Sequence, residues 1–404
     1  MAVLWIVLCR ARNLLAMSAA TDQIRKKIAL ELASVPVLGP KAMEMYLRRK
    51  YNDRVVTPAK VRNFIQAQRD KLNRAVECKS LPWIINLDTF SGCNLKCPFC
   101  PTGTDQMGRP KRQLPIEHAK RVIDSVKDHA LEIRLYNWGE PFLNPDIFEI
   151  IRYAHDAGLY TVISSNLSVK VKDLAQKVVD SKLDRLTASM DGISQTALET
   201  YRRRADADLC YENIAAITRE RKRQGAATPS VELLFLVFRH NEHEIDLLEA
   251  KRLEVGADVF LPRRAFIFHD DFVPRHPDYQ PLQQVFQGAC DFLYAELTVE
   301  ATGVVSPCCT NTSSQWDVGT VDDLAGGLQA FWNAPVYRAM RAYTGGKADA
   351  DLVAPGVDIL CKTCDLIDHP NCSKKALSPL PPSFQAAGIT FIHEIGRNKP
   401  ATTP

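Results

Sequence analysis

The sequence predicts an α/β protein built on a parallel sheet of six strands. Between residues 83 and 261, short apolar runs typical of buried strands alternate with longer segments of helical periodicity. Strands that alternate with helices pair in parallel through right-handed crossovers. The flanking regions differ, because residues 17–80 have a helical pattern and Pro, Gly and Cys become frequent after about residue 270.

The elements are predicted in chain order. A helical N-terminal extension is expected over residues 1–80, with periodic apolar segments at 22–32 and 58–76. The six strands are expected at 83–87, 131–137, 160–164, 185–189, 231–237 and 258–261. The helices after them are expected at 115–129, 146–157, 170–180, 195–201, 211–224 and 242–255. A loosely held tail is expected over residues 377–404, with four prolines between Pro379 and Pro400.

Length and composition limit the class of protein. A chain of 404 residues can form a barrel-sized domain with one or two smaller modules. Its net charge of +4 is small, so charge argues for neither a nucleic acid nor a membrane partner. The apolar residues 2–9 are too short to span a bilayer and lack a preceding basic region. We therefore expect a cytoplasmic protein, whose clustered cysteines bind metal rather than form disulfides.

Three cysteines lie close together after the first predicted strand. Cys93, Cys97 and Cys100 have the spacing Cys-x3-Cys-x2-Cys, which puts three thiolates on one loop. Thiolates are the preferred ligands of iron–sulfur clusters, and three of them leave one iron of a four-iron cluster open to a small molecule. Structural zinc sites instead combine two Cys-x2–4-Cys pairs and fill all four positions. The spacing therefore favours a cluster over zinc.

Polar residues also follow the next three predicted strands. Gly139 and Glu140 come after the second strand, Ser165 and Asn166 after the third, and Ser189 at the end of the fourth. The carboxyl ends of parallel strands form one edge, where ligands bind in α/β proteins. The Glu140 carboxylate can receive an ammonium group at this edge. Ser165 and Asn166 have an alternative role as caps of the following helix.

An arginine-rich segment, residues 202–204, follows the fourth strand. A guanidinium suits a bidentate contact with a carboxylate. Arg202 is the first candidate for such a contact and Arg204 the second. Asp191, at the end of the fourth strand, either faces the substrate or holds the turn.

Together these motifs resemble those of radical S-adenosylmethionine (SAM) enzymes, over about residues 82–265. The resemblance implies a partial (β/α)6 TIM-like barrel over residues 81–270, with the cofactor at the carboxyl ends of the strands. It also implies that the three cysteines hold a [4Fe–4S] cluster whose open iron chelates the amino and carboxylate groups of SAM. In the family, reductive cleavage of SAM yields methionine and a 5′-deoxyadenosyl radical, which abstracts a hydrogen atom from the substrate.

The resemblance further implies which residues contact SAM. Phe99 has the aromatic position that packs near the adenine, which is compatible with a core phenylalanine that shields the cluster. Trp138 replaces the first glycine of the family's Gly-Gly-Glu segment. The other expected SAM contacts are Gly139, Glu140, Ser165, Asn166, Ser189 and Arg202.

The C-terminal region resembles an auxiliary-cluster extension of the SPASM/twitch kind, expected as a small α+β module over residues 281–376. Its expected ligands are Cys290, Cys308, Cys361 and Cys364. Gly303 completes the pattern Cys-x12-Gly-x4-Cys. Four thiolates saturate a second [4Fe–4S] cluster, although they also suit zinc. Only Cys309 and Cys372 remain in this region, which is too few for another cluster and favours a twitch-like module.

A saturated cluster cannot bind substrate without losing a ligand, so its expected role is to move an electron. Superfamily members with twitch modules include alcohol dehydrogenases that act on aminoglycoside precursors, and epimerases and peptide-modifying enzymes share the scaffold. The resemblance therefore implies a radical SAM oxidoreductase that oxidises or rearranges a small polar metabolite. It also implies a reductase such as flavodoxin or ferredoxin as electron donor.

Two alternatives stay open. The chain could modify a ribosomally made peptide, although residues 1–80 lack the three strands of a winged-helix leader-binding domain. It could also be a non-catalytic iron–sulfur electron carrier, which would need neither Glu140 nor Arg202. An epimerase would require a thiol as hydrogen donor, for which Cys210 and Cys309 are candidates.

Overall fold

The structure, a computed structural model, describes residues 39–280, 289–346 and 353–364. The predicted helical segment at 22–32 and the predicted tail lie outside the described residues, as do Cys9 and Cys372. Among the described residues, no helix combines the length and apolar character needed to cross a bilayer.

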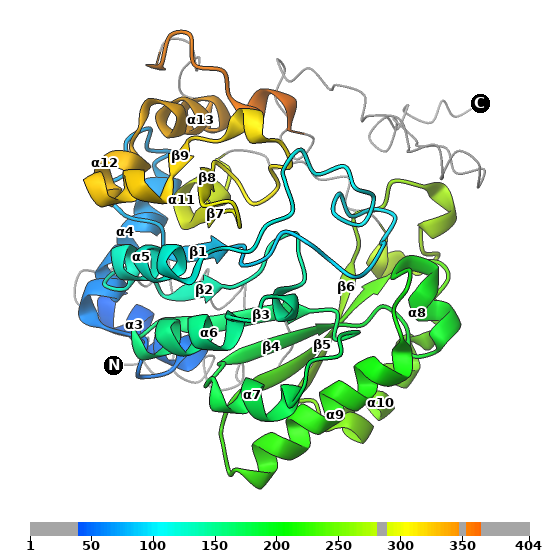
Figure 1. Cartoon of the computed structure of the whole chain (residues 1–404). Coiled ribbons are helices and arrows are strands. Elements are labelled where there is room, and N and C mark those ends of the chain that lie inside the picture. The colour runs from blue at the N-terminus through cyan, green and yellow to red at the C-terminus, as the bar shows by residue number, and fades with distance from the viewer. Residues whose placement is uncertain (1–38, 281–288, 347–352, 365–404) are drawn as a thin grey trace, which may run out of the picture.

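The described residues form a curved sheet of nine strands in the order β6-β5-β4-β3-β2-β1-β7-β8-β9 (Figure 1). The first seven strands pair in parallel, and β8 and β9 continue the sheet in antiparallel pairs. The strands are β1 Ile84–Leu87, β2 Glu132–Arg134, β3 Tyr160–Ser165, β4 Arg185–Ser189, β5 Ser230–Val237, β6 Val259–Arg264, β7 Glu296–Val299, β8 Val304–Ser306 and β9 Gly319–Thr320. The predicted α/β partial barrel is thus confirmed.

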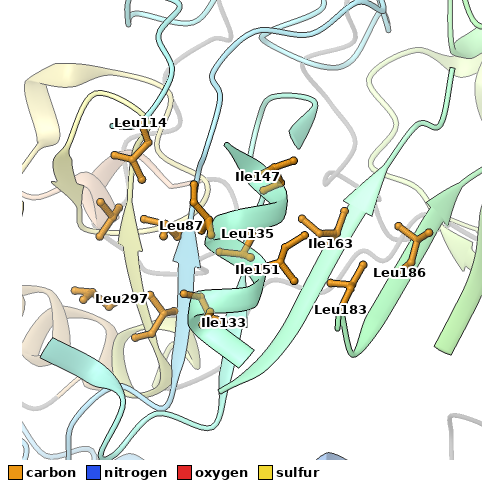
Figure 2. Packing of buried hydrophobic residues seen from close by; sticks show 14 of the residues in the cluster. Leu87, Leu114, Ile133, Leu135, Ile147, Ile151, Ile163, Leu183, Leu186 and Leu297 are labelled. Carbon is orange, nitrogen blue, oxygen red and sulfur yellow. The ribbon is translucent and has the colours of Figure 1, made fainter. Parts of the chain in front are cut away.

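Helices between the strands cover the outer face of the barrel (Figure 1). They are α5 Ile116–Val126, α6 Ile147–Asp156, α7 Leu174–Asp180, α8 Gln195–Tyr201, α9 Ala207–Arg223 and α10 Leu248–Val255, the last preceded by the 3-10 turn η3 Glu242–Leu247. Short 3-10 turns occur at η2 Pro141–Leu143, η4 Asp270–Phe272 and η5 Pro277–Tyr279. Figure 2 shows Ile147 and Ile151 of α6 among apolar side chains of the sheet such as Leu87 and Ile133. Burial of these side chains stabilises the layered fold.

The opposite face of the sheet, the barrel interior, is charged. Arg134 of β2 bonds Glu296 of β7 at 3.0 Å although β1 lies between these strands, so both side chains lie on the concave face. Asn86 of β1 also donates to Glu296, at 2.7 Å. The charged residues of this network are Glu132, Arg134, Arg185, Glu232 and Glu296.

Two helices of the N-terminal extension close the amino end of the barrel. α3 spans Gly39–Tyr51 and α4 spans Pro58–Leu72. Thr57 caps the N-terminus of α4, since its hydroxyl accepts a hydrogen bond from the Lys60 N–H. Their apolar faces form a separate core cluster with Trp83 and Leu131, which precede β1 and β2. These two helices do not cover the carboxyl ends of the strands, where the candidate site lies.

The C-terminal region is joined to the barrel through β7. Its helices and turns are α11 Phe292–Ala295, η6 Ser314–Trp316, η7 Val321–Gly326, α12 Leu328–Trp332, α13 Pro335–Gly345 and η8 Leu360–Thr363. The fully buried Arg341 donates to the carbonyls of Leu293 and Trp332, each at 2.9 Å. The family resemblance implies an α+β module here, but the sequence patterns located none of its strands, because β7 has four residues and β8 three, which is too few to show a period.

Candidate active site

The cysteine loop follows β1 at the carboxyl edge of the sheet, and the segment between β1 and α5 lies next to the C-terminal module (Figure 1). Cys97 is buried, whereas Cys93 and Cys100 are half-buried. The Cys100 N–H donates to the Cys97 carbonyl at 3.2 Å. A Cβ at Gly103 would lie 2.6 Å from the Cys97 backbone nitrogen. Only glycine at this position therefore allows the two backbone segments of the cysteine loop to come this close.

The chemistry of the three cysteines fits an iron–sulfur cluster. Burial raises the pKa of Cys93 to about 11 and of Cys97 to about 12, and a bound cationic centre such as iron would stabilise the thiolates and so favour loss of these protons. In the described residues, no three His, Cys, Asp or Glu side chains surround a point suited to a single metal ion. This does not conflict with a cluster, since each thiolate there binds a different iron and the sulfurs need not meet at one point.

Gly139 and Glu140 lie on the loop after β2, in direct contact with the cysteine loop. The Glu140 N–H donates to the Gly92 carbonyl at 2.8 Å. A Cβ at Gly139 would lie 1.6 Å from the Phe90 carbonyl oxygen, so no larger residue fits at this position. The two loops are therefore held together by the backbone.

The Glu140 carboxylate is buried among hydrogen-bond donors. It accepts from the Ser165 hydroxyl at 2.7 Å, from the Asn166 N–H at 2.9 Å and from the Phe142 N–H at 3.2 Å. Burial raises the pKa of Glu140 to about 6. The three donors act in the opposite direction, because they stabilise the ionised form. An ammonium group brought to this carboxylate would favour the ionised form further.

Ser165 and Asn166 shape the turn after β3. The Leu167 N–H donates to the Ser165 hydroxyl at 3.0 Å, and the Ser168 N–H donates to the Asn166 side-chain oxygen at 2.8 Å. The alternative of capping the next helix is wrong, because Asp173 precedes α7. The Asn166 amide nitrogen also lies 3.7 Å from Cys93 Sγ, which brings the third strand end to the cysteine loop.

Arg202, which directly follows α8, forms an ion pair with the buried Asp191, two residues beyond the end of β4. Its Nε lies 2.7 Å from Asp191 Oδ2, and the nearby Cys97 is among the groups that hold the Arg202 pKa above its usual value. Asp191 also accepts from the Leu236 N–H at 2.8 Å, so it holds the turn. Arg204 is exposed, whereas Ser189 bonds Ser164 of the neighbouring strand at 3.1 Å.

Phe99 lies in a cluster of aromatic rings beside the cysteine loop. Its ring centroid is 4.9 Å from Phe272 and 5.6 Å from both Tyr201 and Phe268. Phe238, directly after β5, packs on Tyr201 at 4.4 Å. Sequence reasoning missed these partners, although Phe238 could have been found by its place at the end of a strand.

Three of the predicted auxiliary ligands are electrostatic neighbours of the fourth, Cys361. Burial raises the pKa of Cys361, and the neighbouring Cys290, Cys308 and Cys364 raise it further. The next residue, Cys309, donates to Cys308 and lowers the pKa of Cys308 to about 7.

The two candidate hydrogen donors differ in their surroundings. The electrostatic neighbours of Cys309 include Glu296 and Arg134, so this thiol lies near the charged barrel interior. Cys210 is fully buried, and its thiol donates to the Asn166 carbonyl at 3.2 Å.

Two family models match consecutive parts of the chain. The radical SAM superfamily model matches residues 87–250, and the SPASM model, an iron–sulfur cluster-binding domain, matches residues 290–365. The chain therefore carries a radical SAM domain followed by a SPASM domain. These two domains imply a SAM-binding [4Fe–4S] cluster and an auxiliary iron–sulfur cluster domain, as the cysteine pattern predicts.

Curated relatives match over part of their length. The AdoMet-dependent heme synthase of Methanosarcina barkeri is 33% identical over 121 residues, which are 30% of this chain and 34% of the relative. The PqqA peptide cyclase of Bradyrhizobium diazoefficiens is 22% identical over 126 residues, or 31% of this chain and 33% of the relative. This chain thus covers about a third of the length of these relatives.

A solved structure shows the same fold. Streptococcus suis SuiB, bound to the precursor peptide SuiA, superposes with a TM-score of 0.53 at 16% identity, covering 75% of this chain and 79% of that chain. At this identity the likeness concerns the fold alone.

Proposed function

We propose that this radical SAM enzyme abstracts a hydrogen atom from a small polar metabolite and oxidises or rearranges it, with the auxiliary domain as electron acceptor. When bound, the cluster and SAM supply reductive cleavage of SAM to methionine and a 5′-deoxyadenosyl radical. A reductase such as flavodoxin or ferredoxin is the proposed electron donor.

The observation that carries the proposal is the convergence of the cysteine loop with Glu140 and Arg202 at one edge of the sheet. Cys93, Cys97 and Cys100 would hold the cluster. Glu140 would bind the SAM ammonium group, and Arg202, positioned by Asp191, would bind its carboxylate. A simple electron carrier would need neither of these charged groups.

The charged barrel interior supports a polar substrate. Glu132, Arg134 and Glu296 face this interior, and their opposite charges are linked across three strands. Such groups can also bind hydroxyl, amino or carboxylate groups of a substrate.

A peptide substrate is the second candidate. Two relatives named above support it, since PqqA peptide cyclase acts on a peptide by its name and SuiB is solved with a precursor peptide. A short precursor peptide encoded beside this chain, and modified by it in vitro, would favour this candidate over the metabolite.

The test is SAM cleavage by protein reconstituted with iron and sulfide under anaerobic conditions and reduced with dithionite. The wild-type protein is expected to form 5′-deoxyadenosine, and the triple variant Cys93→Ala, Cys97→Ala, Cys100→Ala is expected to form none. The matched control is Cys78→Ala, which should retain activity. Cys78 is buried but belongs neither to the predicted ligands of the SAM-binding cluster nor to those of the auxiliary cluster. Product from the triple variant would overturn the ligand assignment.

A further inference from the structure

Two buried carboxylates lie side by side at the carboxyl edge of the sheet, outside the residues assigned above. Asp88 follows β1 and Glu300 follows β7, which pair in parallel with Leu87 opposite Val299. The pairing continues beyond the strands, since the Asp88 N–H donates to the Val299 carbonyl at 2.8 Å. Each of the two acidic residues is 1% exposed.

The Glu300 carboxylate in particular has few partners for a buried acid. Among the described residues, no donor makes a hydrogen bond of ordinary geometry to either Glu300 oxygen or to Asp88 Oδ2. The nearby Arg109 is engaged elsewhere, because it binds Asp317 through two contacts of 2.6 Å and donates to the Ser313 carbonyl at 3.2 Å. Two adjacent ionised carboxylates would be costly in such a site.

Asp88 connects this pair to the SAM site. Its carboxylate faces the backbone N–H groups of Phe90, Asn137 and Gly139, which favour its ionised form. Phe90 belongs to the cysteine loop and Gly139 to the loop that carries Glu140. One side chain therefore faces both loops.

Glu300 connects the pair to the C-terminal module. It begins the turn between β7 and β8, in which the Gly303 N–H donates to the Glu300 carbonyl at 2.8 Å. Gly303 has a φ of +83°, as suits glycine, and β8 leads to the predicted auxiliary ligand Cys308.

We propose that Asp88 and Glu300 share one proton and act as positioning residues that couple the SAM-binding loops to the auxiliary module. With one proton the pair makes an O–H···O hydrogen bond and carries a single negative charge beside Arg109. Without it, two buried anions repel each other and push the turn of the module away from the SAM-binding loops. The inference rests on the proposed function in one respect, the assignment of Glu140 to SAM.

The surrounding charges are consistent with a proton held at neutral pH. Burial raises the pKa of Asp88 to about 7 and that of Glu300 to about 8, and the neighbouring Asp88 raises the Glu300 pKa further. Arg109 opposes this rise and Asp317 supports it. The remaining titratable side chain at this turn is His118, whose Nδ1 lies 2.9 Å from the position a Cβ at Gly303 would take.

The test measures SAM binding to reconstituted holoenzyme by equilibrium dialysis at pH 7.0 and pH 8.8. Between pH 7.0 and pH 8.8 the SAM affinity of the wild type is expected to fall. This fall should be at least about threefold larger than in Glu300→Gln, because the glutamine side chain cannot ionise. Glu254→Gln, on the exposed surface of α10, should behave as the wild type. Equal pH dependence in the wild type and Glu300→Gln would overturn the proposal.

Two further measurements keep the outcome clear. Should Glu300→Gln fail to fold, Asp88→Asn is measured in the same way with the same expectation. Thermal unfolding of the cluster-free protein, compared between wild type and Glu300→Gln across the same pH range, tests the shared proton without SAM. If wild-type protein formed no 5′-deoxyadenosine while this difference persisted, the proposed function would fail and the carboxylate pair would stand.

Discussion

At the residue scale, the site depends on single buried charges with fixed neighbours. Glu140 lies on the loop after β2 and Arg202 directly follows α8, and each is held by groups that favour its charged form. The spacing of the cysteines and the place of Glu140 after a strand, together with the family resemblance for Arg202, brought these residues forward as candidates, and their roles stay predictions. Asp88 and Glu300 were missed because the pairing of β1 with β7 is what brings them to neighbouring positions, although they are 212 residues apart in the sequence.

Glu140→Gln is expected to weaken SAM binding by at least about tenfold, since it removes the negative charge facing the ammonium and a charge-assisted hydrogen bond is worth about 1.5–3 kcal/mol. Equilibrium dialysis of reconstituted protein measures the effect. Glu149→Gln, an acidic residue on α6 that lies away from the site, is the control. Unchanged SAM affinity in Glu140→Gln would contradict its assigned role.

At the element scale, the loops after β1 and β2 function as one unit because their backbones are in contact. The six predicted strands could be found in the sequence because each is an apolar run between helices of clear periodicity. The later strands β7, β8 and β9 could not, since β7 joins the parallel sheet through long-range pairing with β1 rather than through a local pattern.

Gly139→Ala is expected to disrupt this contact, because the added Cβ would overlap the Phe90 carbonyl oxygen. We expect a lower melting temperature and loss of iron from the reconstituted protein. Gly326→Ala is the matched control, because a Cβ there meets nothing within 4 Å. Equal melting temperatures and iron contents for the two variants would show that the loops are not held in this way.

Cys361→Ala is expected to remove about half of the bound iron, because one of two four-iron clusters loses a ligand. SAM cleavage should continue, since the cysteine loop is unchanged. Iron analysis and 5′-deoxyadenosine assays of the same preparation measure both effects. An unchanged iron content would contradict a second cluster at these cysteines.

At the scale of the whole molecule, the barrel and the C-terminal module share one sheet, so their stability is linked. Glu300 sits at this junction, and its folded-state pKa of about 8 lies above its ordinary value of 4.5. Between these values the native state holds a proton that the unfolded state has lost. The free energy of unfolding should therefore fall as pH rises through this window.

For one proton this slope is at most about 1.4 kcal/mol per pH unit. Glu300→Gln lacks the ionisation, so its free energy of unfolding should decline less between pH 5 and pH 8.5. Urea unfolding at several pH values, followed by circular dichroism, measures the difference. Parallel curves for the two proteins would mean that Glu300 ionises normally in the folded state.

Electron paramagnetic resonance of the reduced, reconstituted protein, recorded with and without SAM, tests the central claim most directly. Three thiolates leave one iron open, so we predict that SAM changes the signal of one cluster and that this cluster is missing in the Cys93→Ala, Cys97→Ala, Cys100→Ala variant. A spectrum that SAM leaves unchanged would contradict the account.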